Sequence, residues 1–317
     1  MMSLGTTALP ASLARALEPV LQKQCLNQLE PIRWFRTDWQ RGGAATGFST
    51  WTHEDGSTEE VVVKFPVVLR ELRWTRRMQD CEGVVPKLLA SGIGLGGYDL
   101  AWIVIERLPF GPLGKHWDDN IIQRIAHAAS TFTSAAREFP VDQLGRREDW
   151  GDLLKRAKKS VRTNSIENKS AWKKMHKWCN RYLEEVLDIW RARHTRQWLH
   201  GDVHLANSMC RSEKKNAPVC LIDLAEVHAG YWVEDAIYLE RQLWGHHSRL
   251  ESSNPLKTMA NARKSIGLKV ADDYPELANI RRLLLAATAP AFMQSEGDPR
   301  YLHACLEQLQ QAAERFH

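Results

Sequence analysis

The chain has 317 residues, of which 44% are hydrophobic and 26% charged, and its formal net charge is +5. These values exclude a wholly disordered chain and allow either one large domain or two moderate ones. The small basic excess gives no reason to expect nucleic acid as a partner. The longest apolar stretches, such as 101–105, are too short to span a bilayer, and residues 1–10 lack the pattern of a signal peptide. We therefore expect a cytoplasmic protein with no membrane partner.

The first third of the chain has the pattern of one helix followed by a sheet. Apolar side chains in residues 11–29 are spaced as in an amphipathic helix. Strands are predicted at 32–39, 48–53, 60–65, 87–93 and 100–108, and a second helix is predicted at 67–78. Asp55-Gly56 is a hairpin signal, because glycine tolerates the positive φ that tight turns need. Residues 1–108 are therefore predicted to form a small lobe built on a five-stranded antiparallel sheet.

The rest of the chain has a helical pattern. Residues 109–114 contain two prolines and two glycines and are the predicted linker. Helices are predicted near 119–138, 150–160, 171–193, 233–244, 278–293 and 299–315. Two short strands at 208–211 and 219–222 flank a polar turn. Residues 109–317 are thus predicted to form a larger helical lobe, which makes the fold α+β with two lobes.

The most specific signal in the sequence is the loop at 200–207, which reads HGDVHLAN. Asp202 and Asn207 are five residues apart, so a carboxylate can face an acceptor while a carboxamide oxygen faces a metal. Asp223 follows the apolar strand 219–222 directly and can complete a site of hard oxygen ligands for Mg²⁺. Each residue alone is common in turns, but the ordered set of loop, hairpin, strand and Asp is specific.

This ordered set resembles the core of the aminoglycoside phosphotransferase and choline kinase family, whose members are small-molecule relatives of the protein kinases. The resemblance implies a protein-kinase-like fold, with ATP and Mg²⁺ as cofactors and ATP held between the lobes. It implies that Asp202 is the catalytic carboxylate and that Asn207 and Asp223 bind Mg²⁺. It extends to residues 230–235, where it implies that Asp235 supports the catalytic loop. A carboxylate at the start of a helix is favourable in any case.

Two side chains are candidates for holding the nucleotide phosphates. Lys64 ends the valine-rich strand and is expected, by analogy with kinases, to pair with the phosphates. Glu71 is the only acid between Phe65 and Gln79, so it is the expected partner of Lys64. The alternative is that Glu71 pairs with an arginine on its own helix.

Backbone groups complete the predicted nucleotide site. Gly42 and Gly43 begin a small-residue turn between the first two strands, where kinases cover the phosphates with backbone N–H groups. By resemblance to the kinase hinge, the carbonyl of Glu106 and the N–H of Leu108 are expected to hold the adenine edge. Within the loop, His204 is expected to organise the backbone rather than to act as the base.

The charges give two interpretations of the acceptor. The run 155–177 is strongly basic and forms either a solvated helical face or a surface that attracts an anionic substrate or partner. A polycationic aminoglycoside needs carboxylates, so common aminoglycosides are not expected to be good substrates. Acids elsewhere, such as Glu234, Glu240 and Glu251, leave the opposite possibility open.

The sequence therefore predicts a phosphotransferase that moves the γ-phosphoryl group of ATP to a hydroxyl group of a small molecule. Asp223 is followed by Leu-Ala rather than the aromatic residue and glycine common in kinases, and no activation segment is evident, which disfavours a protein kinase. An atypical protein kinase and a catalytically silent nucleotide-binding scaffold remain as alternatives. The acceptor, the choice between ATP and GTP, and the oligomeric state are not readable from the sequence.

Overall fold

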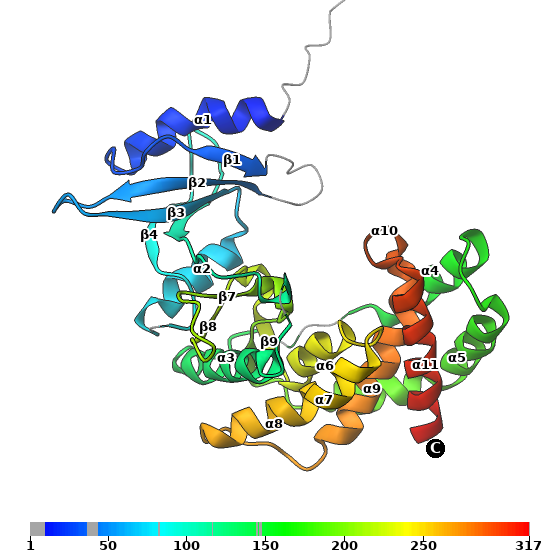
Figure 1. Ribbon diagram of the computed structural model, residues 1–317. Helices are drawn as coiled ribbons and strands as arrows, with labels where there is room; N and C mark the ends of the chain where they lie inside the picture. The colour runs from blue at the N-terminus through cyan, green and yellow to red at the C-terminus, as the bar shows by residue number, and fades with distance from the viewer. Residues whose placement is uncertain are drawn as a thin grey trace, which may run out of the picture. The chain divides into compact units, whose positions relative to one another are not determined.

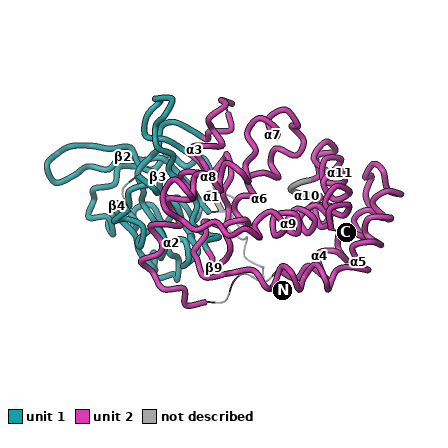
Figure 2. The backbone as a smooth tube through the Cα atoms, turned by 90° about the horizontal axis from the view of Figure 1, so that it is seen from below, with its two compact units in different colours: residues 1–111, 209–227 teal, residues 112–208, 228–317 magenta. Residues whose placement is uncertain are grey.

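The structure is a computed structural model that describes residues 10–36, 44–81, 83–115, 117–143, 145 and 148–316. The chain separates into two compact units (Figure 2). Unit 1 comprises residues 1–111 and 209–227, and unit 2 comprises residues 112–208 and 228–317. Residues 209–227 thus group with unit 1, although they follow the loop 200–207 of unit 2 in the sequence. Whether the units are separate domains that meet at residue 108 stays a prediction.

Unit 1 is built on a five-stranded sheet with the order β1-β2-β3-β5-β4 (Figure 1). All neighbouring strands pair antiparallel, which confirms the predicted sheet. The strands are β1 (Arg33–Arg36), β2 (Ala45–Thr52), β3 (Thr58–Phe65), β4 (Leu88–Gly92) and β5 (Trp102–Glu106).

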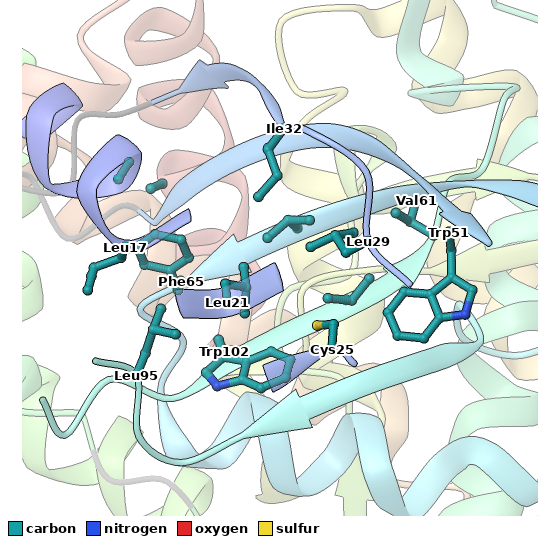
Figure 3. Packing of buried hydrophobic residues seen from close by; sticks show 14 residues of the cluster. Leu17, Leu21, Cys25, Leu29, Ile32, Trp51, Val61, Phe65, Leu95 and Trp102 are labelled. Atoms are coloured by element: carbon teal, nitrogen blue, oxygen red, sulfur yellow. The ribbon is translucent and has the colours of Figure 1, made fainter. Parts of the chain in front are cut away.

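The two faces of this sheet differ, because side chains alternate along a strand. Val61, Val63 and Phe65 of β3 are fully buried and pack with Leu17 and Leu21 of α1 (Pro10–Gln24) (Figure 3). Lys64 has the opposite parity and therefore lies on the face turned away from α1.

Helix α1 is shorter than the predicted helix over 11–29. Leu26 and Asn27 adopt positive φ angles of 53° and 59°, which a right-handed helix cannot include. Leu29 is nevertheless buried in the same apolar cluster as Leu21, which is why the apolar pattern runs past the end of the helix.

Three further elements complete unit 1. Helix α2 (Leu69–Arg77) follows β3, and β7 (Ser208–Cys210) pairs with β8 (Val219–Leu221) to form a hairpin whose first residue belongs to unit 2. The N–H of Leu221 donates to the carbonyl of Val84 at 2.9 Å, so the hairpin is bonded to the segment before β4.

Unit 2 is mainly helical. Its helices are α3 (Ile121–Ala135), α4 (Trp150–Thr163), α5 (Lys169–Arg191), α6 (Val233–Arg241), α7 (His247–Ser253), α8 (Pro255–Ser265), α9 (Tyr274–Thr288), α10 (Met293–Glu296) and α11 (Pro299–Arg315). A small two-stranded sheet pairs β6 (Gln197–Leu199) with β9 (His228–Gly230). Among the described residues, no helix is both long enough and apolar enough to cross a membrane.

The sequence did not predict α7, α8, β6 or β9. Strands of three residues are too short for an alternating pattern to be detected, and α7 buries none of its residues. Helix α8 did carry a start signal, because the side chain of Asn254 caps the N–H of Lys257 and Pro255 occupies the first turn.

Candidate active site

The loop 200–207 belongs to unit 2 and is held by a buried carboxylate of α6. Asp235 accepts hydrogen bonds from the N–H groups of Gly201 at 2.9 Å and His200 at 3.2 Å. Burial raises the pKa of Asp235 above its usual range, against the two backbone hydrogen bonds. Gly201 has a φ of 80°, a conformation that glycine adopts without strain. The support for the loop that the resemblance implied is thus present as two direct hydrogen bonds.

Asp202 and Asn207 lie in contact within this loop. The side-chain nitrogen of Asn207 donates to Asp202 Oδ2 at 2.7 Å and to the Asp202 carbonyl at 3.2 Å. Because the carboxamide nitrogen is engaged by Asp202, the carboxamide oxygen is turned away from it. The Asp202 carboxylate and the Asn207 carboxamide therefore lie side by side in the loop.

His204 organises the loop backbone. Its Nδ1 accepts hydrogen bonds from the N–H groups of Ala206 and Asn207, both at 3.1 Å. An accepting Nδ1 carries no proton, so in the neutral ring the proton is on Nε2, which lies 3.4 Å from Asp202 Oδ2. His204 is thus placed as a hydrogen-bond donor toward Asp202 Oδ2, and its role as an organiser of the loop rather than a base stays a prediction.

The surroundings of Asp202 keep its carboxylate ionised. Burial raises its pKa, but the hydrogen bonds from His204 and Tyr238 act in the opposite direction, and the net pKa is lowered. Gln242, four residues after Tyr238, accepts a hydrogen bond from the Leu205 N–H at 3.2 Å. The sequence analysis missed both residues. Only the placement of α6 beside the loop brings Tyr238 to Asp202 and Gln242 to Leu205.

Lys64, Glu71 and Asp223 lie together within unit 1. Lys64 Nζ donates to Glu71 Oε1 at 2.7 Å and lies 3.4 Å from Asp223 Oδ1. The expected Lys64–Glu71 pair is therefore present. Burial lowers the pKa of Lys64, but the charges of Glu71 and Asp223 outweigh it, so the net pKa is raised and the ammonium stays charged. Burial raises the pKa of Glu71, and the charge of Lys64 opposes that rise.

Asp223 stands at the end of β8 in a left-handed conformation, with a φ of 64°. Its side chain is 42% exposed. Its carboxylate offers hard oxygen ligands of the kind Mg²⁺ takes. Throughout the described ranges, no three His, Cys, Asp or Glu side chains gather into a metal cage. One or two protein carboxylates can be enough for Mg²⁺, because this ion keeps several waters and is also bound by substrate phosphates.

The remaining predicted residues concern the nucleotide base and the phosphate-covering turn. Glu106 ends β5, and Leu108 follows it just before the predicted linker, with only 5% of its surface exposed. Gly42 and Gly43 lie outside the described residues. The sequence analysis gave no weight to the side chain of Glu106. Arg211 holds that side chain through two hydrogen bonds of 2.7 Å each.

Comparison with known proteins gives one family and many structures of one fold. Residues 38–280 match the family model described as the phosphotransferase enzyme family. No curated protein sequence matches the chain.

Three solved structures illustrate the structural likeness. A GDP complex of aminoglycoside 2′-phosphotransferase-IIIa has a TM-score of 0.55 and 13% identity, covering 96% of this chain and 99% of that one. A choline kinase from Streptococcus pneumoniae has a TM-score of 0.57 and 12% identity, covering 96% and 99%. A choline/ethanolamine kinase family protein from Mesorhizobium loti has a TM-score of 0.59 and 10% identity, covering 96% and 95%. These likenesses confirm the predicted kinase-like fold.

Proposed function

We propose that this chain, which belongs to the phosphotransferase enzyme family, transfers the γ-phosphoryl group of ATP to a hydroxyl group of a small molecule in the presence of Mg²⁺. The prediction of a small-molecule kinase is confirmed at the level of the family, whereas ATP, Mg²⁺ and the roles of single residues are proposals. The observation that carries the proposal is the environment of Asp202, whose carboxylate is kept ionised inside the loop 200–207.

Asp202 is proposed to orient the acceptor hydroxyl and to take its proton. Oδ2 already accepts from Asn207 at 2.7 Å and lies 3.4 Å from His204 Nε2, so Oδ1 is the oxygen we assign to the acceptor. A lowered pKa keeps this group in the form that can accept a proton at neutral pH. The proton passes from the hydroxyl to the carboxylate as the acceptor oxygen bonds to the γ-phosphorus. The bond between the γ-phosphorus and the bridging oxygen breaks in the same step, which releases ADP.

Lys64 is proposed to bind the nucleotide phosphates, and Asn207 and Asp223 to hold the metal. The ammonium of Lys64 is fixed by Glu71 at 2.7 Å, which orients it without removing its charge. When bound, Mg²⁺ neutralises the charge that develops on the transferred group. GDP in the structure of an aminoglycoside 2′-phosphotransferase supports a nucleotide ligand for this fold and leaves the choice of purine to experiment.

The two alternatives are weaker. A catalytically silent scaffold does not need an ionised Asp202 in a loop that Asp235 supports by hydrogen bonds. Nor does it need a Lys64 that is paired with the buried Glu71. For an atypical protein kinase, no observation in the structure favours a peptide as acceptor. The solved relatives whose names state an acceptor, choline and aminoglycosides among them, act on small molecules.

The test is a screen for an acceptor with a matched inactive variant. The purified protein, with ATP and Mg²⁺, is assayed for ADP release against amino alcohols, sugars, nucleosides, aminoglycosides and peptides. We expect one small-molecule class to stimulate ADP release and to become phosphorylated. The same acceptor should give almost no product with Asp202→Asn, which keeps the shape of the side chain and binds nucleotide as before. Peptide phosphorylation, or unchanged turnover by Asp202→Asn, would contradict the proposal.

A further inference from the structure

Arg211 joins three segments of unit 1 through a single guanidinium group. It follows β7 directly, at the start of the turn that leads to β8. Nε and Nη2 donate to the two carboxylate oxygens of Glu106, each at 2.7 Å. Nη2 also donates to the carbonyl of Val85 at 3.1 Å, and Nη1 donates to Cys220 Sγ on β8 at 2.8 Å. The guanidinium therefore bonds to the end of β5, to the segment before β4 and to the hairpin.

The geometry of the Arg211–Glu106 pair matters more than its charge. The side chain of Arg211 is 39% exposed and that of Glu106 is 17% exposed, so solvent screens much of the Coulomb attraction. Two parallel hydrogen bonds between planar groups nevertheless fix the orientation of both side chains. Glu106 Oε2 accepts a third hydrogen bond, from the N–H of Lys87 at 3.1 Å. The carboxylate is thus held on both oxygens.

The segment 106–110 is also bonded to this hairpin at its second end, Phe110. The backbones of Phe110 and Cys210 exchange two hydrogen bonds, with N···O distances of 3.2 Å and 2.7 Å. Residues 106–110 are therefore bonded to the β7–β8 hairpin at both ends, through the Glu106 side chain and through the Phe110 backbone. Leu108, whose N–H we assign to the adenine edge, lies between these two points.

We propose that Arg211 is a positioning residue. It holds the adenine-binding segment, residues 106–110, which runs into the linker, in register with the hairpin that leads to Asp223. This inference rests on the proposed function, because it assumes that the linker binds the base. Arg211 need not touch the nucleotide. It fixes where the Glu106 carbonyl and the Leu108 N–H stand, so its loss should weaken binding of the base and leave the phosphate contacts of Lys64 unchanged.

Calorimetric titration with adenosine and with ATP, each with and without Mg²⁺, tests this role. Arg211→Gln should weaken the binding of adenosine and of ATP by the same factor, about tenfold, because both ligands share the base that residues 106–110 are proposed to hold. The tightening of ATP by Mg²⁺ should not change. Arg76→Gln is the matched control, because Arg76 also bonds to a strand of unit 1, at Ser91, but lies outside the linker.

Three further variants separate positioning from simple stabilisation. Arg211→Lys keeps the charge but not the two-point contact, so it should give an intermediate adenosine affinity. Glu106→Gln and the double variant Glu106→Gln/Arg211→Gln should each weaken adenosine as much as Arg211→Gln does, because all three remove the same pair. In nucleotide-free protein, hydrogen exchange at residues 107–110 should be faster in Arg211→Gln than in wild type.

The outcomes distinguish this inference from the proposed function. Wild-type protein that binds neither ATP nor adenosine would overturn the proposed function, while faster exchange in Arg211→Gln would still show that Arg211 holds the linker. Wild-type protein that binds both, with Arg211→Gln binding adenosine equally well, would overturn only the positioning role. Weaker ATP with unchanged adenosine would overturn it too, since that pattern belongs to a phosphate contact. A lower melting temperature with unchanged linker exchange would assign Arg211 a purely structural role.

Discussion

His204 is the residue whose two ring nitrogens have separate tasks. Nδ1 caps the short turn at 205–207 by accepting from two N–H groups, and Nε2 faces the carboxylate of Asp202. A side chain that accepts backbone N–H groups at the start of a turn contributes about 1 kcal/mol. Removing it should also let the pKa of Asp202 rise, because His204 is the main partner that lowers it.

This division of tasks predicts different results for two substitutions. His204→Ala should lower the free energy of unfolding by about 1 kcal/mol, whereas His204→Asn keeps a capping oxygen and should stay near wild type. His204→Asn should also keep turnover within about tenfold, far from the 10²- to 10⁴-fold loss expected for removing a general base. Urea titration and initial rates measure the two effects. Loss of turnover in His204→Asn equal to that in Asp202→Asn would make His204 the base.

Asp223 should act on the nucleotide through the metal, whereas Lys64 should contact the phosphates directly. Asp223→Asn is a mild change because the side chain is 42% exposed, and it should remove the Mg²⁺-dependent tightening of ATP while adenosine binds as before. A charge-assisted contact contributes about 1.5–3 kcal/mol, so the expected loss is roughly 10- to 150-fold. Calorimetry with and without Mg²⁺ measures it. Full Mg²⁺ dependence in Asp223→Asn would place the metal elsewhere.

At the scale of elements, α6 carries the acids that hold unit 2 together. Glu234 Oε1 accepts from Arg193 Nε at 3.0 Å and from the N–H of Tyr231 at 2.9 Å. Burial raises the pKa of Glu234, but the ring of His228, whose Nε2 lies 3.5 Å from Glu234 Oε2, and the charges of Arg193 and Arg281 outweigh it and bring the pKa to about 2. The ionised form is therefore strongly preferred in the folded protein.

This shift predicts a specific loss of stability in acid. The pKa of Glu234 is lower in the folded chain than in the unfolded one, so its contribution is complete above pH 4.5 and is lost as the pH falls toward 2. The expected change is about 3 kcal/mol in the free energy of unfolding. Glu234→Gln should flatten this part of the pH profile, and Glu185→Gln, at an exposed site on α5, should not. Identical profiles for wild type and Glu234→Gln would contradict the assignment.

The same elements show what a sequence reveals and what it hides. Three consecutive valines in β3 and the ordered set from 200 to 223 are local patterns, so the sheet, the loop and the Lys64–Glu71 pair could be predicted. Tyr238 and Gln242 are ordinary helix residues until the fold brings α6 beside the loop. Arg211 sits at a polar turn, where a sequence pattern indicates only a solvated side chain. Contacts between distant segments leave no local signal.

At the scale of the whole molecule, the charges argue against a polycationic acceptor. Glu240 is held by two hydrogen bonds of 2.6 Å from Arg282, and Glu234 by Arg193, so two of the three acids that might have bound a polycation are already paired and buried. Helices α4 and α5 expose a strongly basic surface: Lys155, Arg156, Lys159, Arg162, Lys169, Lys173, Lys174 and Lys177.

We therefore expect kanamycin and similar aminoglycosides to be poor acceptors. Their kcat/KM should be at least about tenfold below that of the best acceptor in the screen, a difference of about 1.4 kcal/mol in transition-state binding. Steady-state rates at low ionic strength make this comparison most sensitive, because salt screens exposed charges. An aminoglycoside that ranks first among the acceptors would contradict the argument from charge.

The β7–β8 hairpin has a consequence for how the protein is made. The chain leaves unit 1 at Gly111, returns at Met209 and leaves again at Val227. During synthesis, the β-sheet emerges from the ribosome long before the hairpin that bonds to Phe110 and Glu106. Domains usually fold one after another as they are translated. Here unit 1, which carries Lys64, cannot complete its fold until residues 112–208 have been translated and the hairpin has followed them. A fragment that ends at the linker therefore lacks Asp223.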